Sequence, residues 1–240
     1  MKKLLKGLQL FLISAVLVGL YAFTNYRNDH RTVNGIDLAF EGNNNLYTTY
    51  EAVNKMLIVK QRGPFKAPKD KVALSTIERW LNEDPMLQNA TVYLTVDGEL
   101  RAVLTQRTPE ARVVTDSVFY LDTQGVPMPL SEHYSARVPI LSGNLSKQAL
   151  ADCHNIIEFI SKDAFLKKNV VGIQVNGDLD YVLQCRLDHF EVRLGAAEAL
   201  KEKMSNYKAF YNKAVADSSL HRYAMVDVRF KNQVVATKKQ

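Results

Sequence analysis

The residue types that most often carry out chemistry are present in this chain, but their spacing matches no known catalytic arrangement. Cys153 and His154 come closest, as a thiol nucleophile directly followed by a base. Adjacent residues of a helix point about 100° apart, so these two side chains cannot form a catalytic pair on their own. We interpret them as a core cysteine beside a surface histidine.

The other candidates for metal binding or catalysis have simpler explanations. Asp178 and Asp180 stand beside Gly177, and short acidic residues are common in turns, so turn chemistry is favoured over metal ligation. The five histidines are scattered: His30, His133, His154, His189 and His221. The sequence has no P-loop, no GxGxxG loop, no GxSxG elbow and no HExxH helix. We therefore predict that the chain is not an enzyme, with no catalytic residue, no metal and no cofactor.

The cysteines and the single tryptophan indicate an ordinary globular core. Two cysteines, Cys153 and Cys185, are too few for a disulfide scaffold or a cysteine-rich metal fold. Whether they form a disulfide in an oxidising compartment depends on geometry that a sequence does not contain. For Trp80, a packing role is favoured over a stacking role in ligand binding.

The distribution of charge argues against nucleic acid as a partner. The net charge is +6, but the excess lies at the two ends of the chain. Five basic residues oppose only Asp29 before residue 32, and Lys238 and Lys239 stand at the C-terminus. The body between them has no net charge, whereas a protein that binds a phosphate backbone needs a basic surface.

The N-terminal segment predicts a membrane anchor. Residues 7–26 contain no charge, and as a helix they would span about 30 Å, the thickness of a bilayer core. Three lysines precede them, so residues 1–6 should stay in the cytoplasm and the body should be exported. A cleaved signal peptide is the alternative, but the apolar run is long and no good cleavage site follows. Residues 27–32 form the predicted stalk.

The body is predicted to be α+β, in two modules. In residues 33–108 a strand, two helices and a hairpin follow one another, and Asp97-Gly98 marks the hairpin turn. Residues 109–237 form a mostly β module with two helices, followed by a basic tail at 238–240. The predicted elements of the first module are a strand at 33–40, helices at 48–57 and 71–82, and strands at 90–96 and 100–107. Those of the second are strands at 118–121, 138–141, 170–175, 181–187, 190–194, 223–230 and 234–237, with helices at 146–161 and 197–215.

The order of these elements, with several short motifs, resembles the FtsQ/DivIB family of bacterial cell-division proteins. The first module resembles the POTRA domain of that family, most clearly at LNEDPM (81–86) and QRTPEA (106–111). Further similarities are FYLDTQG (119–125), VPILSG (138–143), Leu194-Gly195 before the long helix, and VDVRFKN (226–232). Two positions depart from the family: Gln106 stands where it usually has Glu, and Gln233 where Gly commonly follows Asn.

The resemblance implies a non-catalytic scaffold of the cell-division machinery. Such a protein sits in the inner membrane at the division site with its body in the periplasm. It recruits FtsB- and FtsL-like partners and helps to control septal peptidoglycan synthesis. The family uses its last strands for this contact, by strand addition at the C-terminal edge. The implied partner-binding residues are Arg229, Phe230, Asn232, Gln233 and Val234.

Two questions stay open at this point. Period-two alternation places Val226, Val228 and Phe230 on one strand face, so burial in the core competes with partner contact for Phe230. Arg229 faces the other way and is the better contact residue. Two other classes of protein also remain: a POTRA-containing envelope assembly or secretion factor, and a membrane-anchored envelope hydrolase.

Overall fold

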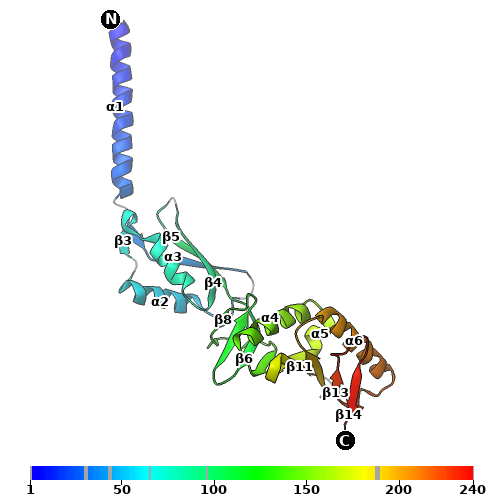
Figure 1. Ribbon diagram of the computed structural model, residues 1–240. Helices are drawn as coiled ribbons and strands as arrows, with labels where there is room; N and C mark the ends of the chain where they lie inside the picture. The colour runs from blue at the N-terminus through cyan, green and yellow to red at the C-terminus, as the bar shows by residue number, and fades with distance from the viewer. Residues whose placement is uncertain are drawn as a thin grey trace. The chain divides into compact units, whose positions relative to one another are not determined.

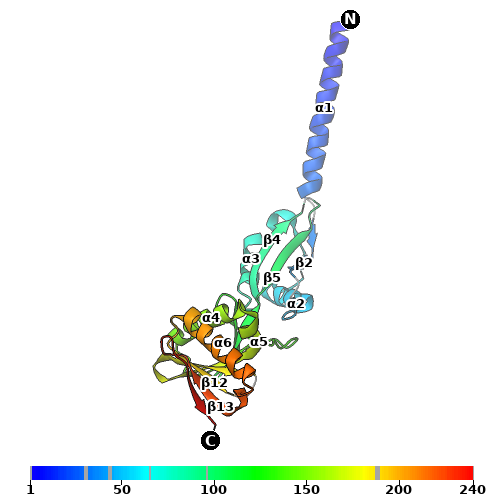
Figure 2. The ribbon, with the colours of Figure 1, turned by 90° about the vertical axis from the view of Figure 1, so that its right-hand side faces the viewer.

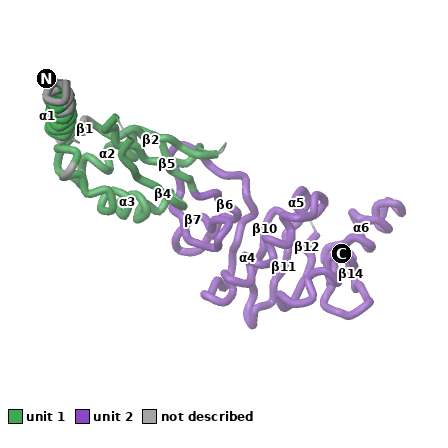
Figure 3. The backbone as a smooth tube through the Cα atoms, turned by 90° about the horizontal axis from the view of Figure 1, so that it is seen from above, with its two compact units in different colours: residues 1–106 green, residues 107–240 purple. Residues whose placement is uncertain are grey.

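The computed structural model describes residues 2–29, 32–42, 45–64, 66–95, 97–186 and 190–239 (Figure 1). The chain divides into two compact units, Met1–Gln106 and Arg107–Gln240 (Figure 3). The sequence prediction places this boundary two residues later. Each unit is described by itself below. Predictions that involve residues 1, 30, 31, 96, 187–189 and 240 lie outside the described residues, including parts of the stalk and tail.

The first element is a single long helix, α1 (Lys2–Asp29). Its described side chains are exposed, among them the large apolar groups of Phe11, Leu17 and Phe23. Within the described part of the chain, no helix combines the length and apolar character needed to span a membrane. The predicted anchor at residues 7–26 is therefore not confirmed.

The rest of the first unit is a small α+β domain, and its predicted strand-helix-helix-hairpin order is confirmed. The central strand β5 pairs in parallel with β2 and antiparallel with β4, and Val53, Leu57, Ile77 and Leu81 of the two helices are buried in its core. The elements are β1 (Thr32–Asn34), β2 (Ile36–Glu41), α2 (Tyr50–Gln61), β3 (Lys66–Pro68), a 3₁₀ turn η1 (Lys69–Lys71), α3 (Leu74–Asn82), β4 (Leu87–Leu94) and β5 (Leu100–Gln106).

Two details of this domain correct the sequence prediction. The strand predicted at 33–40 is broken at Gly35, whose φ of +94° is a conformation that glycine adopts readily. Its first part, β1, pairs instead with β3, which lies in a segment predicted to be a loop. The helix predicted from Lys71 begins at Leu74, because residues 69–71 form the tighter turn η1.

The second unit contains one nine-stranded sheet with the order β14-β13-β12-β11-β10-β9-β6-β7-β8. Its elements are β6 (Pro109–Val114), β7 (Val118–Asp122), β8 (Pro127–Met128), β9 (Ile140–Gly143), α4 (Lys147–Ser161), α5 (Ala164–Asn169), β10 (Val170–Asn176), a 3₁₀ turn η2 (Gly177–Leu179), β11 (Asp180–Cys185), β12 (Glu191–Gly195), α6 (Leu200–Ala216), a 3₁₀ turn η3 (Leu220–Arg222), β13 (Tyr223–Asp227) and β14 (Val235–Lys238).

The helices of this unit follow from two parallel strand pairs. β9 pairs in parallel with β10, and β12 with β13, so each connection must cross over the sheet. Helices α4 and α5 form the first crossover and α6 forms the second. The strands β9 and β12, which begin the two crossovers, run in the same direction, and both crossovers lead toward the β14 end of the sheet. Two right-handed crossovers of this kind place their helices on the same face of the sheet. Figures 1 and 2 show α4, α5 and α6 on the same side of the sheet.

The core of the second unit lies between these helices and the sheet. Tyr207 of α6 is fully buried, and its hydroxyl accepts a hydrogen bond from Asn169 at 2.5 Å. The structure corrects the predicted helix count, because this unit has three α-helices among its described residues. The additional helix is α5, which has only six residues, too few for a hydrophobic period to show in the sequence. Strands β6 and β8 were not predicted either.

Candidate partner-binding edge

The strands β13 and β14 form an antiparallel hairpin at one end of the nine-stranded sheet. Val226 of β13 lies opposite Ala236 of β14, and Asp227 lies opposite Val235. On its other side β13 pairs in parallel with β12, so it is an inner strand. Among the described residues, no strand pairs with the outer side of β14. Every second residue of β14 therefore directs its backbone N–H and C=O away from the sheet.

The other strand edges differ from β14 in how far they are covered. At the opposite end of the same sheet, β8 has only two residues, and one of them is Pro127, which has no N–H to donate. In the first unit β4 is an edge strand, but α3 covers its backbone. Asn82 Oδ1 accepts from the Ala90 N–H at 2.9 Å, and Glu78 Oε2 accepts from the Val92 N–H at 3.0 Å. Among the described residues, β2 and the two strands of the small sheet, β1 and β3, also have an unpaired outer side.

An ion pair fixes the start of the connection between β13 and β14. The guanidinium of Arg229 donates to both carboxylate oxygens of Asp227, with Nε–Oδ1 at 3.0 Å and Nη2–Oδ2 at 2.6 Å. The Arg229 backbone N–H also donates to Oδ1 at 3.1 Å. Burial by itself would raise the pKa of Asp227, but these hydrogen bonds outweigh it and hold the pKa below its usual value. The carboxylate thus stays ionised and holds the arginine.

Arg229 also packs over the end of the neighbouring strand. Gly195, the last residue of β12, has a φ of +67°. A Cβ atom at Gly195 would lie 2.7 Å from both Cγ and Cδ of Arg229. The stem of Arg229 therefore occupies the space that a side chain at residue 195 would need. This contact gives a structural reason for the Leu194-Gly195 motif that precedes the long helix.

The rest of the connection leaves one aromatic ring exposed. Phe230 is 47% exposed, and the Arg229 guanidinium carbon lies 5.7 Å from the centroid of its ring. Asn232 has a φ of +56°, in the left-handed region that asparagine tolerates, and the Gln233 N–H donates to the Phe230 carbonyl at 3.5 Å. Val234 is partly buried against the core.

These positions resolve the question that alternation left open. The strand predicted at 223–230 ends at Asp227, so Val226 and Val228 are buried as expected, whereas Phe230 lies beyond the strand and is not. The sequence reasoning missed Asp227 as the partner of Arg229. The strand predicted at 234–237 is confirmed as β14 (Val235–Lys238), but it extends one residue further, so Lys238 pairs opposite Tyr223 rather than lying in the predicted tail. A carboxylate two residues before Arg229 was the available signal for the ion pair.

The residues first considered for chemistry do not come together as a site. Cys153 is fully buried, and desolvation raises the pKa of its thiol to about 12, which opposes formation of the nucleophilic thiolate. His154 faces Glu110 instead, with Nδ1–Oε2 at 3.4 Å. Asp180 pairs with Arg193 at 2.8 Å, and Asp178 adopts a left-handed turn conformation. No cluster of three or more metal-ligating side chains is found in the part of the chain that the structure describes.

Comparison with known proteins finds a family-model match within each unit of the chain. A family model described as FtsQ/DivIB, C-terminal related, matches residues 108–237, which is more than half of the chain. A second model, described as a POTRA-like domain, matches residues 36–105. A search of curated proteins found no match to the chain.

Proposed function

The chain belongs to the FtsQ/DivIB, C-terminal related family, and we propose that it is a non-catalytic membrane scaffold of the cell-division machinery. In this proposal the body lies in the periplasm and recruits FtsB- and FtsL-like proteins at the β14 edge. By holding them at the division site it helps to control septal peptidoglycan synthesis. The POTRA-like unit is a second interaction domain of the same scaffold.

The open outer side of β14 is the observation that carries this proposal. A scaffold needs a surface that a partner can recognise, and an unpaired strand edge offers a row of main-chain donors and acceptors. β14 offers such a row within the described residues, whereas β4 is covered by α3 and β8 is very short. A partner segment that adds a tenth strand would satisfy the outward groups of β14.

Side chains next to the edge support recognition of a particular partner. Phe230 projects as an exposed aromatic ring beside the hairpin, which is the kind of group enriched in protein interfaces. Arg229 has a different role, since its guanidinium is held by Asp227 and its stem covers Gly195. We therefore assign Arg229 to positioning the connection and Phe230 to direct contact.

The membrane part of the proposal rests on α1 and on the basic residues that precede its apolar run. An isolated helix with many exposed apolar side chains needs a partner surface to cover them, and a bilayer would do so. The exposed large apolar residues of α1 are Phe11, Leu12, Ile13, Val16, Leu17, Val18, Leu20, Tyr21, Phe23 and Tyr26. The anchor is tested by alkaline extraction of membranes from expressing cells. Release of the full chain into the soluble fraction would contradict it.

Proline substitutions along β14 test strand addition directly. Adjacent residues of an edge strand direct their backbone N–H groups to opposite sides of the strand. One of the two variants Ala236→Pro and Thr237→Pro therefore removes an N–H that donates to β13, and the other removes an N–H that would donate to the partner. We expect one variant to destabilise the second unit. The other should stay folded and lose capture of the FtsB-like partner in a crosslinking pull-down from cells.

A matched pair of side-chain variants separates ring contact from main-chain pairing. Phe230→Ser should weaken capture without unfolding the chain, whereas Val118→Ser, an exposed apolar residue on β7 at the far end of the sheet, should leave capture unchanged. If both proline variants fold and still capture the partner at the wild-type level, the β14 edge is not the binding site. The β2 edge of the POTRA-like unit would then be examined next.

A further inference from the structure

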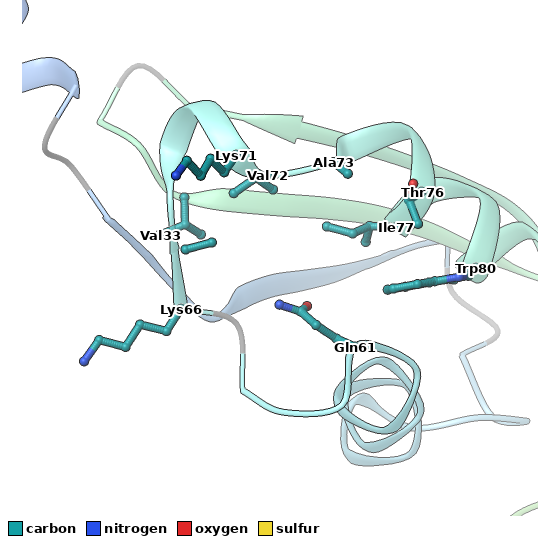
Figure 4. Close-up of a pocket in the computed structure, with 10 residues that line it drawn as sticks. Val33, Gln61, Lys66, Lys71, Val72, Ala73, Thr76, Ile77 and Trp80 are labelled. Carbon is teal, nitrogen blue, oxygen red and sulfur yellow. The ribbon is translucent and has the colours of Figure 1, made fainter.

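The first unit contains a cavity of about 190 Å³ that none of the assignments above uses. It opens between the end of α2, the β1–β3 pair and the start of α3 (Figure 4). An engineered protein cavity of about 150 Å³ is enough to hold benzene, so this one has room for a somewhat larger ring. Its apolar lining residues are Val33, Ala67, Val72, Ala73, Ile77 and Trp80.

One polar atom in this cavity has no partner. Figure 4 shows the side-chain amide of Gln61 directed into the space between Val33, Ile77 and Trp80. Its Oε1 atom is buried, and among the described residues no donor reaches it. A buried acceptor without a donor is costly, so a ligand that brings an N–H or O–H group to this point would gain from the contact.

The rim of the cavity carries unpaired positive charge. Lys66 and Lys71 line it, and both side chains are exposed. Arg62 and Lys69 lie in the same connection between α2 and α3. None of these four cations forms an ion pair with a carboxylate within the described residues. In the segment 61–71 Asp70 is the single acidic residue. The rim therefore favours a ligand with negative charge.

We propose that this cavity is a docking site for an acidic segment of another protein that inserts one tryptophan side chain. The indole ring fills the apolar space and lies against Trp80. Its Nε1–H donates to Gln61 Oε1, and carboxylates on either side of the tryptophan meet Lys66 and Lys71. Phenylalanine lacks the donor. Tyrosine has one, but its oxygen also brings acceptor lone pairs that the apolar walls would leave unsatisfied.

The single tryptophan of the chain provides the measurement. We would label the full chain with 5-fluorotryptophan, which places one ¹⁹F nucleus at position 80 on the cavity wall. The probe is an unlabelled synthetic peptide, acetyl-Asp-Glu-Trp-Asp-Glu-amide. We expect its titration to shift the ¹⁹F resonance saturably, and to do so more weakly as the salt concentration rises.

Changes in the peptide test each contact without altering the protein. Replacing the tryptophan with 2-naphthylalanine keeps a fused ring but removes the N–H, and should weaken binding about fivefold, which is the usual net effect of one hydrogen bond. Replacing the four acidic residues with lysine should abolish the shift. Gln61→Leu removes the acceptor and leaves the indole N–H unpaired, so this variant should lose the preference for tryptophan and bind the naphthylalanine peptide at least as tightly as the tryptophan peptide.

The charged rim is tested with a matched pair of variants. The double substitution Lys66→Glu/Lys71→Glu should weaken binding of the acidic peptide by about fivefold or more, since each exposed ion pair contributes a modest amount to the binding free energy. Lys168→Glu/Lys213→Glu makes the same change in net charge on exposed residues of the second unit and should have no effect.

Three results would overturn the proposal. The first is no saturable shift at millimolar peptide and low salt. The second is an equal response to the acidic and the lysine peptides. The third is a shift produced by vesicles of phosphatidylglycerol but not by peptide, which would identify the occupant as a lipid. Because the peptide variants act on unaltered protein, the test does not depend on any substitution that fails to fold.

Discussion

Replacement of Gly195 by alanine measures how much the packing of Arg229 against the end of β12 contributes to stability. The residue has a φ of +67°, and alanine in this left-handed region costs about 1–2 kcal/mol. The added Cβ would also lie 2.7 Å from Cγ and Cδ of Arg229. Those atoms can move only if the guanidinium leaves Asp227, which costs about 1 kcal/mol more for an ion pair of this exposure. We expect Gly195→Ala to destabilise the second unit by about 2–3 kcal/mol in all.

Gly125 supplies the matched control for this experiment. It lies in the same unit with a φ of +71°, and a Cβ there would meet His154 at 3.4 Å, near an ordinary contact distance. Gly125→Ala should therefore cost only the backbone strain, about 1–2 kcal/mol. In a chain that already carries Arg229→Ala, the cost of Gly195→Ala should fall to the same value, because the side chain that clashes with the added Cβ is gone.

Hydrogen exchange of the full chain is the suitable assay, since the single tryptophan lies in the first unit and does not report on the second. Exchange of the β12–β14 amides gives the free energy of opening for each variant. The predicted coupling between residues 195 and 229 is about 1 kcal/mol. Equal costs of Gly195→Ala in the presence and absence of the Arg229 side chain would refute the proposed coupling between the two residues. So would a cost no greater than that of Gly125→Ala.

Three further changes test other parts of the structure. Asn82→Ala should lower the free energy of unfolding of the first unit by about 1–3 kcal/mol, because the backbone N–H of Ala90 loses its acceptor; urea unfolding followed by Trp80 fluorescence measures it. The depressed pKa of Asp227 means that its pairing contributes stability above about pH 4, which is lost as the pH falls through the folded-state pKa. Asp227→Asn should remove this contribution and so reduce the acid dependence of hydrogen exchange in β12–β14. Burial raises the thiol pKa to about 12 at Cys153 and about 11 at Cys185, so iodoacetamide at about pH 8 should alkylate both only after unfolding.

Each of these three predictions has its own contradiction. Asn89→Ala, at an exposed position of β4, is the control for the first prediction. An equal loss of unfolding free energy in this control would exclude the hydrogen bond from the β4 backbone to Asn82 as the cause. The pKa values of Asp163 and Glu158 are also lowered, so the comparison is made on the β12–β14 amides, and the second prediction is wrong if these lose the same protection on acidification in Asp227→Asn as in the wild type. Alkylation of either cysteine in the folded chain, read by mass spectrometry, would contradict the third.

Local sequence patterns predicted much of the first unit and the two long helices, α4 and α6, of the second. Strict alternation and the Asp-Gly turn predicted the β4–β5 hairpin, and the helix predicted at 146–161 is confirmed as α4. These elements depend on contacts between residues close in the chain, so the sequence alone contains their signal. Shorter pieces such as α5, β3 and β8 were missed, because two to six residues are too few to show a period.

The candidate partner edge was decided by tertiary structure. Alternation shows which side chains share a strand face, but it cannot show which strand lies outermost in a sheet. That order depends on the long-range parallel pairings of β9 with β10 and of β12 with β13, which place the last hairpin at the end of the sheet. The exposure of Phe230 has the same origin, since the strand ends at Asp227 where Arg229 turns back to pair with it and to cover Gly195. Contacts between residues far apart in the chain leave no periodic signal, so only the folded structure reveals them.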